Sequence, residues 1–226
     1  MQTGRGRPMP EVTAYTWVPE FAQGFVRDLR LRWALEEAGR SYSQNLISLE
    51  ENKTPGYLRR QPFAQVPAYR DGPVDMFESG AIVVQIAERS DALMPSDEAG
   101  RARTLSWIFA AMNSVEPQVM NVRLAEQFWA AEPWANAFAQ KAAEALQGRL
   151  ARLSDWLGDT DYLEGRFTAG DLMMACVLRE VSGSPHLAAF PRLEAYCTRC
   201  LSRPAFARAL EAQLKNFAGA GPAPVA

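Results

Sequence analysis

The feature that most constrains this chain is a proline at the start of a short apolar run. Pro67 directly follows Val66 in the segment FAQVPAYRDGPVDMFESGAI, residues 63–82. Proline has no backbone N–H, so within a sheet it is confined to the first residue of a strand, to an edge or to a bulge. We therefore expect a strand that begins near this proline and leaves part of the preceding backbone unpaired.

The pattern around the proline predicts a mixed domain of strands and helices. Short β-branched and aromatic runs favour strands, and apolar residues at helical spacing favour helices. Gly39 is placed to end the first helix, and the Asp71-Gly72 pair is placed to turn a hairpin. The expected elements are a strand (12–18), a helix (25–38), a strand (41–49), a short helix (54–61), a hairpin (66–76) and a helix (79–89). The order is β-α-β-α-β-β-α.

The second half of the chain has a different composition. Alanine, leucine, glutamate and arginine dominate it, with proline and glycine at intervals, which is typical of an all-helical domain. Within it, Thr168 and Asp171 are spaced as a capping box with Asp in place of Glu. The expected division is a flexible lead-in (1–10), an α+β domain (11–90), a linker (91–96), an all-α domain (97–218) and a flexible tail (219–226).

Charge and rare residue types narrow the range of functions. The formal net charge of −2 provides no basic field, and no apolar run is long enough to span a bilayer, so we expect neither nucleic acid nor a membrane as a partner. The three cysteines are odd in number and late in the chain, which argues against a disulfide framework and favours a cytoplasmic setting. With one histidine, His186, we expect no metal site.

Four segments, in order, resemble the glutathione S-transferase superfamily. They are ALEEAG (34–39), NKTPGYLRRQPFAQVPAYRDG (52–72), MFESGAI (76–82) and FTAGDLMMA (167–175). The likeness covers nearly the whole chain. It implies a thioredoxin-like N-terminal domain followed by an all-α C-terminal domain. It also implies glutathione as co-substrate, a small hydrophobic electrophile as second substrate, and a homodimer.

The resemblance also assigns a role to the proline. In this family the X-Pro bond is cis, which turns the N–H and C=O of Val66 toward a cleft. There the cysteinyl part of glutathione can bond to them as a short added strand, and Gln65 would line the same wall. The alternative from sequence alone is a trans Pro67 at a strand edge.

The remaining glutathione-binding residues are implied in the same way. Ser79 would hold the γ-glutamyl carboxylate at the start of a helix, where N–H groups and the helix dipole favour an anion. Glu78 would face the neighbouring ammonium group, and Lys53 with Asn52 would meet the glycyl carboxylate. Ser79 could instead be only an N-cap, and Lys53 only a solvated surface residue.

The group that activates the thiol is left open by the sequence. The family places a Tyr, Ser or Cys after the first strand or at the start of the first helix, but residues 17–28, WVPEFAQGFVRD, contain no Ser, Thr, Cys or Tyr. Trp17 takes the tyrosine position in one register, and Tyr15 does so in another. Alternation along the expected strand would place both on one face. Backbone N–H groups at the helix start are a third possibility, and both aromatics could simply be core residues.

The sequence therefore predicts a glutathione transferase, with rivals that share its fold. One rival is a non-catalytic glutathione-binding or scaffold protein, and the other is a glutathione-dependent isomerase, dehalogenase or peroxidase. Cys197 and Cys200 have a Cys-x-x-Cys spacing, but they lie inside a helical pattern. We interpret them as packed thiols and not as a redox pair.

Overall fold

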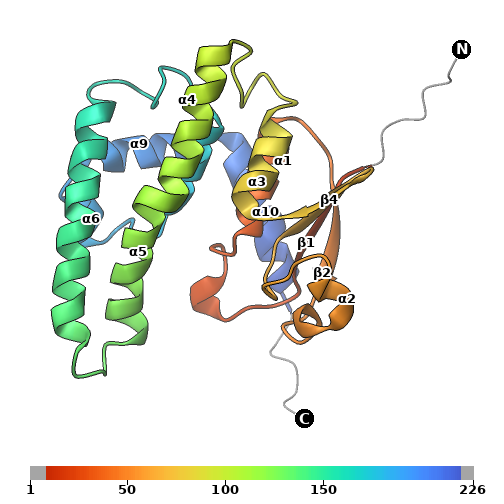
Figure 1. Ribbon diagram of the computed structural model, residues 1–226, viewed down its shortest axis with the longest axis horizontal. Coiled ribbons are helices and arrows are strands. Elements are labelled where there is room, and N and C mark those ends of the chain that lie inside the picture. Colours follow the sequence, from red (N-terminus) through yellow and green to blue (C-terminus); the bar gives the residue numbers. More distant parts are fainter. Residues whose placement is uncertain (1–8, 220–226) are drawn as a thin grey trace, which may run out of the picture. The chain divides into compact units, whose positions relative to one another are not determined.

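The computed structural model describes residues 9–219 (Figure 1). The lead-in and the tail expected at the two ends fall almost entirely outside the described residues. The chain divides into two compact units, the first made of Met1–Arg89 with Pro204–Ala226 and the second of Ser90–Arg203.

A four-stranded sheet forms the centre of the first unit. Its strands are β1 (Glu11–Tyr15), β2 (Ser43–Ile47), β3 (Ala68–Asp71) and β4 (Val74–Phe77), in the order β2-β1-β3-β4. β1 pairs in parallel with β2 and antiparallel with β3, and β3 pairs antiparallel with β4. The hairpin turn between β3 and β4 contains Gly72 with φ of 63°, as its Asp-Gly sequence predicted.

The first unit also contains helical segments. They are η1 (Glu20–Ala22), α1 (Asp28–Glu37), η2 (Glu51–Lys53), α2 (Pro55–Leu58), α3 (Ser79–Ala87) and α10 (Pro204–Phe217). Figure 1 shows α1 and α3 on one face of the sheet. α1 ends where Gly39 adopts φ of 62°, as predicted. It begins at Asp28 instead of residue 25, because η1 and a turn occupy part of the preceding loop.

α1 is buried on nearly all sides because it packs against β1, α3 and α10. Two of its polar side chains form a buried ion pair, with Arg32 Nε 2.6 Å from the carboxylate of Asp28. Gln213 of α10 donates a further hydrogen bond to Asp28 at 2.6 Å. α10 therefore groups with the first unit, whereas the domain division drawn from the sequence assigned this helix to 97–218.

The second unit is helical, and the predicted class of an α+β domain followed by a helical region is confirmed. Its elements are α4 (Glu98–Phe109), η3 (Ala110–Val115), α5 (Glu116–Arg123), η4 (Leu124–Phe128), α6 (Ala135–Leu157), α7 (Ala169–Arg179), α8 (Pro185–Ala188) and α9 (Pro191–Leu201). η3 and η4 are π-helical turns. Pro117 follows η3 and has no N–H for the carbonyl of residue 113, which accounts for the irregular turn at this point.

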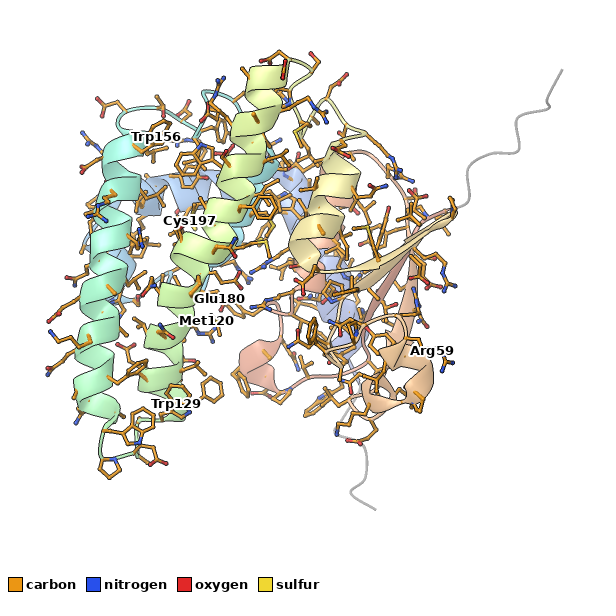
Figure 2. The ribbon with its side chains drawn as sticks, viewed as in Figure 1. Arg59, Met120, Trp129, Trp156, Glu180 and Cys197 are labelled. Atoms are coloured by element: carbon orange, nitrogen blue, oxygen red, sulfur yellow. The ribbon has the colours of Figure 1, made fainter. Side chains whose placement is uncertain are left out.

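α7 is the central helix of the second unit, and its residues 169–178 are all buried. The predicted capping box is present: Gly170 N–H donates to the Thr168 hydroxyl, and Thr168 N–H donates to the Asp171 carboxylate. Figure 2 shows Trp129 and Trp156 at opposite ends of the α5–α6 hairpin. Across residues 9–219, no helix combines the length and apolar character needed to cross a membrane.

Candidate functional site

The backbone of Val66 is open on the first unit. The Val66-Pro67 peptide bond is cis, as the resemblance implied, and β3 begins only at Ala68. Within residues 9–219, neither the N–H nor the C=O of Val66 has a hydrogen-bond partner in the protein. Buried main-chain groups are nearly always paired, so this donor and this acceptor are available to an external peptide-like ligand.

Two side chains fix the loop that leads into Val66. The Gln61 side-chain carbonyl accepts from the N–H groups of Phe63 at 2.7 Å and Gln65 at 3.1 Å. The Tyr57 hydroxyl donates to the C=O of Gln65 at 2.7 Å. Both main-chain groups of Gln65 are thus engaged by side chains, while its own side chain is exposed. The loop holds the open groups of Val66 in place through its neighbours.

The second part of the site is the start of α3. Glu78 precedes the helix with φ of 71° and ψ of 109°, and its side chain forms no cap hydrogen bond. Ser79 is the first helical residue and not the N-cap, and it is 3% exposed. Its hydroxyl accepts from Arg30 Nη1 at 3.2 Å. The first N–H groups of a helix have no intrahelical acceptors, so this end favours an anion.

Arg30 lies beside the candidate site and was not singled out from the sequence. It lies on α1, is 4% exposed and brings a guanidinium to the N-terminal end of α3. A guanidinium beside a helix N-terminus adds its charge to the positive end of the helix dipole. The signal in the sequence was the pair of arginines among apolar residues in DLRLRWAL. A helix that is buried on one face only has no need of arginines between its apolar residues.

The structure gives Lys53 and Asn52 different surroundings. Lys53 ends η2 with a side chain that is 63% exposed, and its Nζ is 3.1 Å from the Glu50 carboxylate. Asn52 is 6% exposed, and its amide nitrogen donates to two protein acceptors. Of the two, Lys53 has the charge and the exposure to meet a ligand carboxylate. Glu78 is also exposed, as an ammonium-binding group would need to be.

Tyr15 lies at the end of β1 and packs against the buried cluster that includes Val66. Its hydroxyl oxygen accepts from Asn52 Nδ2 at 2.7 Å, and the same nitrogen donates to Ala64 C=O at 2.7 Å. Burial raises the pKa of the Tyr15 phenol, and the Asn52 hydrogen bond and the charge of Lys53 offset this only in part. The phenol therefore keeps its proton at neutral pH and can donate it in a hydrogen bond.

Trp17 lies outside the strand. β1 ends at Tyr15, and the N–H of Thr16 bonds to the C=O of Ile47, the last residue of β2. The expectation that Tyr15 and Trp17 share a strand face is therefore wrong, because β2 provides no partner beyond Ile47. Trp17 is half-buried, and its indole N–H has no hydrogen-bond partner within the described part of the chain.

The late cysteines are packed thiols. Cys197 and Cys200 lie within α9, are 2% and 0% exposed, and are free. Burial raises the pKa of the Cys197 thiol to about 12, so it is not a thiolate at neutral pH. The described residues also contain no group of three or more His, Cys, Asp or Glu side chains that could hold a metal ion.

The fold and the site together define a class of protein. A thioredoxin-like sheet domain presents an unpaired main-chain segment at a cis-proline, and a helical region follows it. Residues 12–88 match the family model described as "Glutathione S-transferase, N-terminal domain". Curated glutathione S-transferases align with about three quarters of the chain, so the chain is similar to the glutathione S-transferase superfamily beyond its N-terminal domain.

Two relatives and one solved structure illustrate the likeness. The glutathione S-transferase of Hyoscyamus muticus is 28% identical over 180 residues, covering 74% of this chain and 83% of that protein. The disulfide-bond oxidoreductase YfcG of Escherichia coli is 29% identical over 200 residues, covering 80% and 88%. A glutathione transferase family member from Pseudomonas fluorescens pf-5, solved with two glutathione bound, has a TM-score of 0.78 at 24% identity, covering 90% and 92%. At 24% identity, the likeness to this structure shows a shared fold and nothing more.

Proposed function

We propose that this protein is a glutathione transferase that binds reduced glutathione on its first unit and presents the thiolate to a small hydrophobic electrophile. The open N–H and C=O of Val66 carry this proposal. A cysteinyl residue has the complementary C=O and N–H, so it can pair with Val66 as one residue of an added antiparallel strand. Pro67 keeps this position clear of the sheet, and Gln65 flanks it.

The γ-glutamyl group is proposed to bind at the start of α3. Its carboxylate would accept from the hydroxyl and N–H of Ser79, with the buried Arg30 guanidinium adding charge. The exposed Glu78 would face the ammonium group. The exposed Lys53 would meet the glycyl carboxylate, where a charge-assisted contact contributes about 1.5–3 kcal/mol when desolvated.

We propose Tyr15 as the donor that holds the thiolate, in preference to Trp17. Tyr15 packs against the buried cluster that includes Val66, and its hydroxyl has a proton to donate. A phenol O–H also polarises more readily toward a thiolate than an indole N–H does. The protein would act by positioning and thiol activation, and not by a covalent enzyme intermediate.

The test is conjugation of glutathione to chlorodinitrobenzene. We expect turnover by the wild-type protein, a loss of roughly 10- to 100-fold in kcat/KM for Tyr15→Phe, and a smaller effect for Trp17→Phe. Turnover that falls only in Trp17→Phe would reassign the donor. Binding without turnover would favour a non-catalytic glutathione-binding protein.

A second activity has its own support. One relative, YfcG, is a disulfide-bond oxidoreductase. Glutathione-dependent reduction of a small disulfide, measured beside the conjugation assay, distinguishes the two. Reduction without conjugation would make the oxidoreductase reaction the function of this site.

The same proposal includes a homodimer and a cytoplasmic location. Phe63 is 65% exposed next to the site loop, with its ring centroid 6.1 Å from that of Phe77. An exposed aromatic on a fixed loop suits a protein interface. In analytical ultracentrifugation we expect the wild-type protein to sediment as a dimer and Phe63→Ser to sediment as a monomer. Phe128→Ser is the control and should remain a dimer, because Phe128 is also exposed, at 52%. Wild-type protein that sediments as a monomer would contradict this.

The free cysteines support the proposed cytoplasmic location, because disulfides are rare in that compartment.

A further inference from the structure

The Asn52 side chain connects the two parts of the site that handle the cysteinyl group. One nitrogen, Nδ2, donates both to the hydroxyl oxygen of Tyr15 and to the C=O of Ala64, each at 2.7 Å. Ala64 belongs to the loop that leads into Val66. The position of the Tyr15 hydroxyl is therefore linked, through a single amide group, to the loop that presents the open backbone.

The orientation of this amide is fixed by its partners. The carbonyl of Ala64 can only accept, so the atom facing it must be the nitrogen of Asn52. The nitrogen's second hydrogen then points at Tyr15, whose hydroxyl must act as acceptor there. A hydroxyl that accepts at one position keeps its own O–H free to donate elsewhere. Within residues 9–219, no protein group accepts that hydrogen.

The oxygen of the Asn52 amide argues against a purely structural role for this residue. Asn52 Oδ1 is buried and has no hydrogen-bond donor among the described residues. A buried acceptor without a donor lowers stability. An asparagine is thus a costly choice for packing alone at this position, whereas its two donated hydrogen bonds set the direction of the Tyr15 proton.

We propose that Asn52 is a positioning residue, which directs the O–H of Tyr15 toward the thiol of glutathione bound at Val66. This inference rests on the proposed function and assigns Asn52 a role other than contact with the glycyl carboxylate. With its amide hydrogens on Tyr15 and Ala64, Asn52 acts on the ligand through the phenol. Lys53, next in sequence, remains exposed for the carboxylate.

The experiment is a double-mutant cycle read by the pKa of the bound thiol. Thiolate absorbance of the glutathione complex is titrated against pH in wild type, Tyr15→Phe, Asn52→Leu and the double variant. Asn52→Leu keeps the size and adds no charge, so it does not repel the thiolate as Asn52→Asp would. Asn216→Leu is the control, because Asn216 also donates from its amide, to Gln44 at 2.9 Å, but is only half-buried and lies on α10.

We expect Tyr15→Phe to raise the thiol pKa by about 1–2 pH units and Asn52→Leu by roughly half as much, since a donor to a charged group is lost or misdirected. In the Tyr15→Phe background, Asn52→Leu should then add nothing. Asn216→Leu should leave the thiol pKa unchanged. If Asn52→Leu does not fold, Asn52→Ser, which retains one donor, takes its place.

Three results would overturn the inference in distinguishable ways. Equal shifts from Asn52→Leu in both backgrounds would mean that Asn52 does not act through Tyr15. A thiol pKa that Tyr15→Phe leaves unchanged would remove the donor role while glutathione binding stands. No binding of glutathione to the wild-type protein would refute the proposed function and, with it, the role of Asn52.

Discussion

Asp171 makes more hydrogen bonds than a capping residue needs, and its removal should be unusually costly. The side chain is fully buried. Oδ1 accepts from Leu163 N–H at 2.9 Å and the Tyr196 hydroxyl at 3.0 Å, and Oδ2 accepts from Thr168 N–H at 2.9 Å and its hydroxyl at 3.1 Å. The Asp171→Ala variant leaves three buried donors without an acceptor, because the Thr168 hydroxyl can rotate toward another partner.

The magnitude follows from those three donors. Each unsatisfied buried donor costs about 1–3 kcal/mol, so the free energy of unfolding should fall by about 3–9 kcal/mol. Because domains are stable by only about 5–15 kcal/mol, the second unit of Asp171→Ala should be near its unfolding threshold. Asp171→Asn should cost less, since an amide oxygen at the Oδ1 position still accepts from Leu163 and Tyr196.

Asp97 provides the matched control. It caps α4 with one hydrogen bond, to Gly100 N–H at 2.8 Å, and it is exposed. Asp97→Ala should therefore cost about 1 kcal/mol. Equilibrium urea unfolding, followed by tryptophan fluorescence, compares the variants. The comparison holds provided that the unfolding free energy falls with urea concentration at the same slope in each variant. A loss in Asp171→Ala within about 1 kcal/mol of the Asp97→Ala value would refute the reasoning from orphaned donors.

Two further predictions concern glycine packing and pH. A Cβ on Gly170 would lie 2.6 Å from Trp107 Cβ, whereas one on Gly148 meets nothing within 4 Å. Gly170→Ala should therefore lose about 1–3 kcal/mol of unfolding free energy and Gly148→Ala should gain about 0.5–1 kcal/mol; equal melting temperatures would contradict this. Burial tends to raise the pKa of Asp75, but hydrogen bonds from Arg70 and from residue 60 lower it overall. Its contribution to stability is present above the unfolded pKa of about 3.9 and is lost as pH falls through the lower folded value. Carboxyl titration by NMR checks this, and a folded pKa at or above the unfolded value would contradict it.

Much of the first unit was predictable because its boundaries coincide with residues of special conformation. Gly39 ends α1 and Gly72 turns the hairpin, both at positive φ. Pro67 and Ser79 mark the start of β3 and α3. The same local chemistry that ends or begins an element also exposes main-chain groups, so the candidate site could be located together with the fold.

The errors arose where a neighbour in space decides the outcome. The apolar run to Val18 reads as strand, but β1 ends at Tyr15 because its parallel partner ends at Ile47. Periodicity identified the last helix without indicating what it packs on, and the contact of Gln213 with Asp28 places that helix in the first unit.

Polar residues of the site were missed for a related reason. Arg30 and Gln61 were not singled out from the sequence, yet they are 4% and 3% exposed and bond to Ser79 and to the loop before Val66. A single sequence carries residue types and spacing, and burial of a polar side chain depends on tertiary packing. The resemblance assigned Asn52 to the glycyl carboxylate, and only the structure shows that its amide donates to Tyr15.

Calorimetric titration with reduced glutathione tests the central claim most directly. Wild-type protein is compared with Ser79→Ala at the start of α3 and with Ser106→Ala, an exposed serine of α4 whose hydroxyl bonds to its own helix at 2.9 Å. We predict binding to wild type, affinity weakened roughly 10- to 100-fold in Ser79→Ala, and no change in Ser106→Ala. Binding that both serine variants retain in full would contradict the assignment of the carboxylate to the α3 terminus. Absence of binding to the wild-type protein would contradict the account as a whole.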